Sequence, residues 1–324
     1  MIGISANSIA SFCSCRRKYY YEKVLHRVPA TTSTSLSIGS AVHKGLEAYW
    51  NNINAISHEA DLLRQAIQDA TDACHGLGVE DICKVQAMLE GYMRYFDEDR
   101  TRFTTVDVES SFREFLINDV TVHGFMDAVV IEKGTGKYWL VEHKTARAVD
   151  DYYRQHINID VQCGIYLYAL SEKYGNDVGG VIYDIIRKPG IKMQMGESDE
   201  EFEARKAQSK APGRCKQKKA ETCEEYMDRL CDDLANAYER ICITMDNIDL
   251  DNIISDIKGH AEEIIGAHET GNFFRSTCNC SGKFGVCPYF DVCCGRNSIE
   301  SDIYIDSQSP FQSQESNNGS EIEE

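Results

Sequence analysis

Two acidic residues and a lysine stand at spacings that can support metal-assisted chemistry. Glu142 and Lys144 are two residues apart in the run VEHKT, and Asp127 ends the apolar run GFMD. Alternate side chains of a strand point to one face, so Glu142 and Lys144 are expected to share a pocket, and a hairpin can bring Asp127 beside them. An isolated Glu-x-Lys triplet is often only a surface cross-strand pair, so the assignment depends on the surrounding sequence.

The chemistry that these residue types support is phosphodiester hydrolysis. Two neighbouring carboxylates repel each other, and the arrangement becomes favourable when a hard cation such as Mg²⁺ or Mn²⁺ binds between them. Such an ion lowers the pKa of a bound water and polarises a phosphate, and a lysine stabilises the negative charge that develops. Asp127, Glu142 and Lys144 are therefore candidate catalytic residues.

The sequence around these residues predicts an α/β core. Between Thr104 and Lys144 three runs have the composition and alternation of strands, separated by turn residues at 118–119 and 134–136, which predicts an antiparallel meander. A helix is expected at about 152–173 and a strand at 178–187. Apolar residues recur at helical spacing in four earlier segments: 5–24, 39–52, 58–75 and 80–100.

A basic run interrupts the second half of the chain. Residues 205–219 hold seven Lys and Arg and no acid, and they precede a stretch that is expected to be helical to about 244, with another helix at 250–270. The run is either a solvated surface loop or a contact for the DNA backbone.

Four motifs follow one another along the chain. They are GSAVH (Gly39–His43), GFMD (Gly124–Asp127), EHK (Glu142–Lys144) and the pair Gln162 and Tyr166. In this order they resemble the motifs of RecB-like PD-(D/E)XK nucleases, and the resemblance covers residues from about 5 to 295. It implies a restriction-endonuclease-like fold, with a mixed central sheet flanked by helices and helical additions at both ends.

The resemblance also implies a role for each motif residue. Lys144 would be the catalytic lysine, and Gln162 and Tyr166, four residues apart on one helical face, would position DNA. The implied ligands of the Mg²⁺ or Mn²⁺ ion are His43, Asp127, Glu142 and the backbone carbonyl of His143.

The fourteen cysteines are unevenly distributed. Five lie between 278 and 294 and two, Cys13 and Cys15, lie near the start, while seven are scattered and fit small buried side chains. Without an export signal in a chain of this length, metal ligation is a better interpretation of the clustered cysteines than disulfide bonding.

Four of these cysteines form a distinct set: Cys15 near the start, and Cys280, Cys287 and Cys293 near the end. The set resembles the iron–sulfur branch of the same superfamily, the CRISPR-associated and AddB-like exonuclease type, in which one N-terminal cysteine joins three C-terminal ones. The resemblance implies a 4Fe–4S cluster that these four cysteines bind and that links the two ends of the chain. The alternatives are a structural Zn²⁺ ion and the neighbouring residues Cys13, Cys278 and Cys294 as ligands.

The composition disfavours a protein that coats nucleic acid by charge alone. The chain of 324 residues has 52 acidic and 34 basic side chains and a formal net charge of −18. DNA binding then requires local groups of basic residues and metal ions that neutralise carboxylates. No stretch approaches the roughly 20 apolar residues of a membrane helix, and the first residues lack the features of a secretion signal, so a cytoplasmic protein is expected.

We expect a single nuclease domain over residues 1–299 and a disordered acidic tail over 300–324, which holds seven acidic residues and no Lys or Arg. The domain is expected to comprise a mainly helical part (1–103), the sheet core (104–190), a second helical part (191–270) and a cysteine segment (271–299).

The leading hypothesis is a Mg²⁺- or Mn²⁺-dependent deoxyribonuclease, an exonuclease that processes DNA ends in replication, recombination or repair. No helicase motif is visible, so unwinding would come from a partner such as a helicase or recombination protein. A non-catalytic DNA-binding scaffold of the same fold and a site-specific endonuclease are the alternatives. Intact Asp127, Glu142 and Lys144 argue against the scaffold, and the lack of a separate recognition domain argues against the endonuclease.

Overall fold

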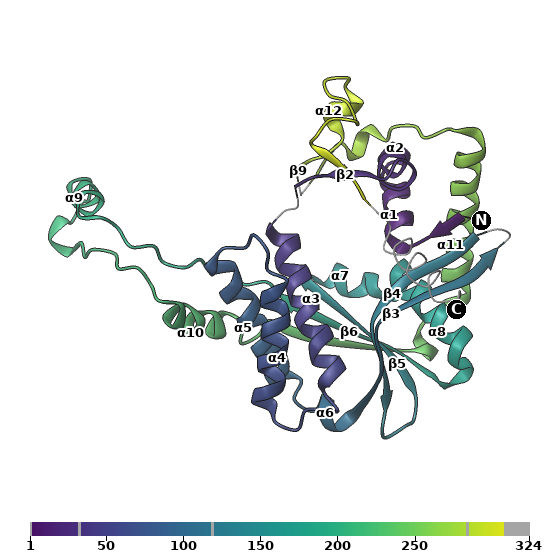
Figure 1. Ribbon diagram of the computed structural model, residues 1–324, viewed down its shortest axis with the longest axis horizontal. Coiled ribbons are helices and arrows are strands. Elements are labelled where there is room, and N and C mark those ends of the chain that lie inside the picture. Colours follow the sequence, from purple (N-terminus) through teal and green to yellow (C-terminus); the bar gives the residue numbers. More distant parts are fainter. Residues whose placement is uncertain (1, 32–33, 118–119, 283–284, 308–324) are drawn as a thin grey trace, which may run out of the picture. The chain divides into compact units, whose positions relative to one another are not determined.

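The computed structural model describes residues 2–31, 34–117, 120–282 and 285–307 (Figure 1). The tail expected to be disordered over 300–324 is ordered in its described part, because Tyr304–Asp306 form a strand that pairs with Arg27–Pro29; the rest, from 308 onwards, lies outside the described residues. The chain divides into two compact units, and strands β3 and β4 contribute to both. The first unit comprises Met1–Ser33, Phe112–Gly124 and Asp251–Glu324, and the second comprises Thr34–Ser111 and Phe125–Leu250.

The second unit is built around a mixed sheet. β4 pairs with β3 and runs antiparallel to β5, β5 is parallel to β6, and β6 is antiparallel to β7. The strands expected at 104–144 and 178–187 are therefore confirmed. The bounds are Phe103–Ile117 (β3), Val120–Glu132 (β4), Tyr138–Ala146 (β5), Val178–Arg187 (β6) and Tyr238–Thr244 (β7).

Four helices cover one face of this sheet with a continuous apolar core. The core joins Trp50 and Leu89 of the helices to inward residues of the strands, such as Val141 and Ile182. Residues 143 and 184 have the same strand parity as these, so they face the same helices. The helices are Thr34–Asn52 (α3), Glu59–Asp72 (α4), Val79–Tyr95 (α5) and Cys223–Asp233 (α10), with the short α6 (Asp99–Arg102) nearby in sequence.

The helix predicted at 152–173 is interrupted. The structure has α7 at Asp151–His156, a short 3₁₀ turn, and then α8 at Val161–Tyr174. Asp160 caps α8, since its carboxylate accepts a hydrogen bond from the backbone N–H of Cys163 at 2.9 Å. Apolar periodicity continues across the break, which is why the pattern suggested one helix. α8 contacts β5 and β6.

The prediction of helix as far as residue 244 is wrong in its last part. α10 ends at Asp233, and β7 (Tyr238–Thr244) pairs with β6 along its length. The run YERICIT does not alternate regularly, but its tyrosine, two isoleucines and threonine suit a strand at the margin of a sheet. The part between 191 and 270 is therefore less helical than expected, although it also contains the helix α9 (Asp199–Ala207).

The first unit brings the two ends of the chain together. β1 pairs in parallel with the start of β4, and β2 pairs with β10 in antiparallel fashion. Arg17 donates to the backbone carbonyl of Phe273 at 2.7 Å, and Tyr19 stacks on the Phe273 ring. Its elements are β1 (Ile2–Ile4), α1 (Ala6–Ser14), α2 (Arg16–Tyr19), a π-turn (Tyr20–Val24), β2 (Arg27–Pro29), α11 (Leu250–Thr270), β8 (Ser281–Gly282), β9 (Gly285–Val286), α12 (Phe290–Cys293) and β10 (Tyr304–Asp306).

The helices expected at 5–24 and 250–270 correspond to α1 with its continuation and to α11. Ser5 is the N-cap of α1, where its hydroxyl accepts from the backbone N–H of Ser8. Within the described part of the chain, no helix combines the length and apolar character needed to cross a membrane.

Candidate active site

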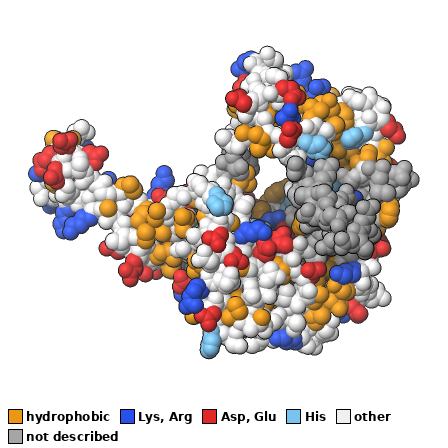
Figure 2. All heavy atoms as spheres, viewed as in Figure 1, with side chains coloured by type: hydrophobic (Ala, Val, Ile, Leu, Met, Phe, Trp, Pro, Cys, Tyr) orange, Lys and Arg blue, Asp and Glu red, His pale blue; other side chains and the backbone are white. Residues whose placement is uncertain are grey.

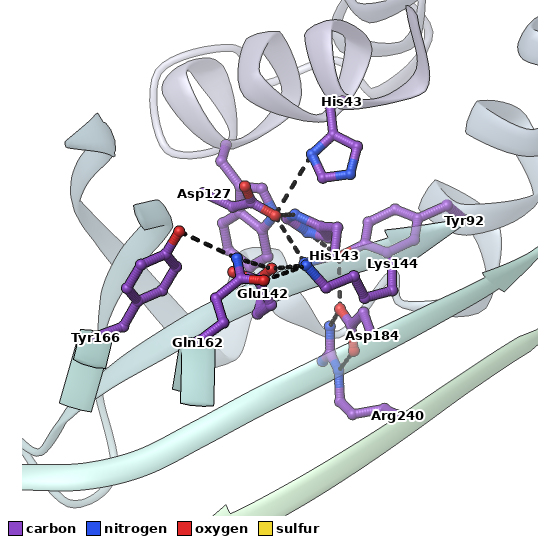
Figure 3. A network of polar contacts seen from close by, with 11 residues as sticks. His43, Tyr92, Asp127, Glu142, His143, Lys144, Gln162, Tyr166, Asp184 and Arg240 are labelled. Carbon is purple, nitrogen blue, oxygen red and sulfur yellow. Dashed lines mark hydrogen bonds and ion pairs between the residues drawn. The ribbon is translucent and has the colours of Figure 1, made fainter. Parts of the chain in front are cut away.

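The structure brings all seven predicted site residues of the second unit into one cluster (Figure 3). Asp127 comes from β4, three consecutive residues come from β5, His43 comes from α3, and Gln162 and Tyr166 come from α8. Glu142 and Lys144 lie on the α8 face of the sheet, whereas His143 points to the opposite face, as the strand alternation requires.

Lys144 is held by two oxygen acceptors. Its ammonium group donates to Glu142 Oε1 at 2.5 Å and to Gln162 Oε1 at 2.8 Å. Gln162 in turn donates from Nε2 to Glu142 Oε1 at 2.8 Å and contacts the Tyr166 hydroxyl at 3.0 Å. These contacts hold the lysine beside the carboxylate. They also keep it protonated: burial lowers the pKa of Lys144, but the charge and hydrogen bond of Glu142, together with the charge of Asp127, outweigh burial and raise it.

Only one of the two carboxylate oxygens of Glu142, Oε1, takes part in these contacts. The side chain is 1% exposed, and among the described residues its Oε2 has no hydrogen-bond partner. Burial, followed by the charge of Asp127, raises the pKa of Glu142 to about 7. A buried carboxylate oxygen without a partner is costly in a protein, so the site suits a cation that ligates this oxygen.

Asp127 lies among hydrogen-bond donors. Its Oδ2 accepts from the backbone N–H of His143 at 2.8 Å, and it lies 3.2 Å from Nδ1 of that histidine and 3.5 Å from Nδ1 of His43. Burial opposes ionisation, but these two histidines outweigh it and hold the pKa of Asp127 well below its usual range. Asp127 is therefore a carboxylate at neutral pH.

A third acidic residue, Glu109 on β3, was not predicted. One ligand atom each from His43, Glu109 and Asp127 lie within 4.8 Å of one another, a spacing that a single metal ion can bridge. Glu109 has a left-handed backbone (φ 49°), which is unusual for a residue within a strand. Asp107 stabilises this kink, since it accepts hydrogen bonds from Ser110 and from the backbone N–H of Val108.

His143 supplies more than the backbone carbonyl that was predicted for it. The indole N–H of Trp50 can only donate, and it points to His143 Nε2 at 3.0 Å, so Nε2 carries a lone pair. The neutral ring then has its proton on Nδ1, which faces Asp127 Oδ2. The tautomer is fixed from the core side, and the histidine orients the aspartate. The backbone carbonyl role remains a prediction.

Behind His143 lies a buried ionic network that the sequence did not indicate. The Tyr92 hydroxyl donates to Asp184 at 2.8 Å and lies 3.2 Å from His143 Nε2. Arg240 donates two hydrogen bonds of 2.7 Å to Asp184 and two more, at 2.5 and 2.8 Å, to Asp99. Asp184 and Asp99 are 0% and 1% exposed. One guanidinium therefore neutralises two buried carboxylates on the core side of His143.

A glycine allows α3 to approach the ends of the strands. A Cβ atom at Gly39 would lie 3.0 Å from Thr145 Oγ1 and 3.5 Å from Lys188 Nζ, so a larger residue would require the Thr145 side chain to move by a few tenths of an ångström. His43 follows one turn later on α3 and reaches Asp127 from there. This contact explains the glycine at the start of the GSAVH motif.

The predicted cysteine quartet lies together in the first unit. Cys15, Cys280, Cys287 and Cys293 line one pocket of about 320 Å³, and burial raises the pKa of both Cys287 and Cys293. The three alternative ligands do not line that pocket. Cys13 is exposed and contacts His260 at 3.5 Å, and Cys278 and Cys294 are also exposed.

The chain matches the family model of the PD-(D/E)XK nuclease superfamily over residues 3–293. This match covers most of the chain, and the protein therefore belongs to that superfamily. The curated proteins include no significant match to this sequence.

Removal of the buried guanidinium is expected to destabilise the second unit strongly. Arg240→Met leaves Asp99 and Asp184 without a counter-charge, and we expect the free energy of unfolding to fall by about 3–5 kcal/mol. Arg154→Met is the matched control. Arg154 pairs at the surface with Glu239, the neighbour of Arg240 on β7, and the loss of this exposed pair should lower the free energy of unfolding much less. Denaturant unfolding measures both, and equal losses would contradict the importance of the network.

Proposed function

We propose that the protein is a Mg²⁺- or Mn²⁺-dependent deoxyribonuclease that processes DNA ends as an exonuclease. The observation that carries the hydrolytic site is the buried Oε2 of Glu142, which lies beside Asp127 and Lys144 and has no hydrogen-bond partner in the described part of the chain. The chain also belongs to a nuclease superfamily. The exonuclease mode and the DNA-end setting rest on the resemblance to RecB-like enzymes.

The proposed ligands of the ion are His43, Asp127, Glu142 and the backbone of His143. We add Glu109, because its carboxylate lies in the same group of ligand atoms as His43 and Asp127. Carboxylate oxygens suit Mg²⁺ and Mn²⁺. When bound, the ion lowers the pKa of a water molecule and polarises the scissile phosphate.

The residues of the chain supply position and charge. Lys144 is protonated and held by Glu142 and Gln162, so its ammonium group can face a non-bridging phosphate oxygen and stabilise the charge that develops on it. Gln162 and Tyr166 continue from the lysine along α8, where they can hold the DNA strand in register. His143 keeps Asp127 ionised and oriented.

We further propose that Cys15, Cys280, Cys287 and Cys293 hold a 4Fe–4S cluster. Their shared pocket supports this quartet over the neighbouring cysteines. Four cysteine ligands are what a 4Fe–4S cluster requires, and a structural Zn²⁺ ion held by the same four thiolates is the alternative.

Substitution of the carboxylate tests the active site directly. Glu142→Gln and Lys144→Met should each lower cleavage by at least ~10²-fold, because each removes a group that acts on the transition state. Glu132→Gln, an acid at the surface end of β4, is the control and should cut normally. Degradation of end-labelled single- and double-stranded DNA with Mg²⁺, Mn²⁺ or EDTA gives the rates, and normal cleavage by Glu142→Gln would show that the site is misplaced.

Proton competition should make metal binding depend on pH. The pKa of Glu142 is raised to about 7, and Asp127 raises the pKa of His43 against the effect of burial, so both groups carry protons under acidic conditions. The increase in Tm caused by Mn²⁺ should therefore be small at about pH 5.5 and should rise to a plateau near pH 8. Thermal unfolding with and without Mn²⁺ measures it, and a pH-independent shift would mean that the ion binds elsewhere.

The cysteine quartet predicts a selective effect of serine substitutions. Cys287→Ser should lose iron and visible absorbance and should lower Tm, whereas Cys278→Ser, at an exposed neighbouring position, should retain all three. Anaerobically purified protein, analysed for iron and zinc, provides the measurement. Stoichiometric zinc without iron, or a stable Cys287→Ser protein that retains its iron, would contradict the proposed cluster.

A further inference from the structure

A long arm projects from the second unit between β6 and α10. Residues 189–222, here called the arm, form two extended segments with α9 at the far end (Figure 1). Apart from α9 and one 3₁₀ turn at Pro212–Arg214, these residues have no regular secondary structure. The active-site cluster and the fold of the unit do not account for its presence.

The outer part of the arm carries unpaired positive charge. Residues 204–220 hold seven Lys and Arg and no acid, in a chain with a net charge of −18. Arg205 and Lys206 form ion pairs within the arm. The other five are exposed and, among the described residues, make no ion pair; they are Lys210, Arg214, Lys216, Lys218 and Lys219.

The acidic residues of the arm form their ion pairs with other residues than these five, although Glu197 lies beside Lys218 and accepts a hydrogen bond from its backbone N–H. Glu197 is paired with Arg205, and Glu221 is paired with Arg229 at the base. The remaining acids belong to α9, where three stand in the first turn, next to the positive end of the helix dipole. In Figure 2 the acidic and basic side chains at the tip form separate patches. The four lysines and the arginine therefore keep their charge available for a partner.

The arm is ordered by contacts of its own. Its two segments are joined by backbone hydrogen bonds from Glu197 to Lys218 and from Glu221 to Gln194, at 3.1 and 3.0 Å. A Cβ atom at Gly196 would lie 3.0 Å from the backbone nitrogen of Ala220, so the glycine permits their close approach. At the base, the buried Tyr226 donates to the carbonyl of Ile191 at 2.9 Å. Such preorganisation lowers the entropic cost of binding a partner.

The base of the arm lies at the active-site end of the sheet. β5 and β6 are parallel, Lys144 pairs with Ile185, and Ala146 pairs with Arg187, so both strands end at one edge. The backbone N–H of Lys188 still donates to the carbonyl of Ala146, at 2.7 Å. The arm therefore leaves the sheet about 10 Å beyond the level of the catalytic lysine, at ~3.3 Å per residue.

We propose that the arm binds the phosphate backbone of the DNA substrate at a distance from the scissile bond. This inference rests on the proposed nuclease function. The extended segment 189–198 can span at most about 35 Å, which is about ten base pairs of duplex. Five exposed cations that make no ion pair among the described residues suit successive phosphates, and contacts of this kind are independent of base sequence. They would retain DNA on an otherwise acidic enzyme.

The test is the affinity for DNA under conditions in which no cleavage occurs. We expect the quadruple substitution of Lys210, Lys216, Lys218 and Lys219 by Gln to weaken binding at least tenfold. The dependence of log K on log salt should become shallower by about 0.9 for each duplex phosphate that the protein no longer neutralises, and by about 0.7 for each phosphate of a single strand. Fluorescence anisotropy in EDTA, with labelled DNA of about 30 nucleotides, gives both quantities.

Two control variants separate the arm from net charge and from folding. Lys133, Lys137, Lys173 and Lys258 changed together to Gln remove the same charge from other surfaces and should leave the affinity close to that of the wild type. The same four arm lysines changed to Arg keep the charge and should retain binding. The two arm variants should keep the wild-type Tm, because the arm lysines are exposed.

The outcomes distinguish this proposal from the proposed function. If the arm variant binds and responds to salt like the charge-matched control, the arm does not bind DNA, while metal-dependent cleavage by the wild type can still stand. If the wild type binds neither form of DNA, the arm proposal fails as well. Reduced binding to an acidic protein, with DNA affinity unchanged, would likewise overturn it.

Discussion

The site depends on holding two carboxylates, Asp127 and Glu142, close together inside the protein. Their mutual repulsion and their burial both oppose ionisation. The groups around each carboxylate shift its pKa in a different direction. Asp127 receives hydrogen bonds from His143 and lies beside His43, and its pKa falls. Glu142 accepts hydrogen bonds from Lys144 and Gln162 at one oxygen and, within the described ranges, none at the other, and its pKa rises. This asymmetry leaves a place for one cation.

The rest of the second unit keeps that arrangement in place. On the core side of Asp127, His143 lies 3.2 Å from the Tyr92 hydroxyl. This hydroxyl donates to Asp184, which also accepts from Arg240, so polar groups extend from the site into the core between the sheet and the helices. Buried ion pairs contribute little net stability, but they penalise any arrangement in which one partner is missing. The network therefore favours one orientation of the strand that carries Glu142 and Lys144, at the cost of sensitivity to substitution.

The sequence indicated what depends on local periodicity and spacing, and it missed what depends on tertiary contact. Asp127, Glu142 and Lys144 could be placed because strand alternation puts them in one pocket. β7 was mistaken for helix, since its strand character emerges only beside β6. Glu109 and Arg240 lie in runs without a motif, and their roles follow from a kinked strand and from partners more than fifty residues away. Resemblance, by contrast, supplied His43 and the cysteine quartet.

The central claim is that one divalent ion binds between these side chains. A crystal structure of the Mn²⁺-soaked protein, with an anomalous difference map, tests it directly. The account predicts a peak at coordination distance, about 2.0–2.3 Å, from Asp127, Glu142 and His43, with Glu109 close enough to join them. A protein that binds Mn²⁺ only at other residues, or a Glu142 whose Oε2 stays without a ligand in the presence of the ion, would contradict it.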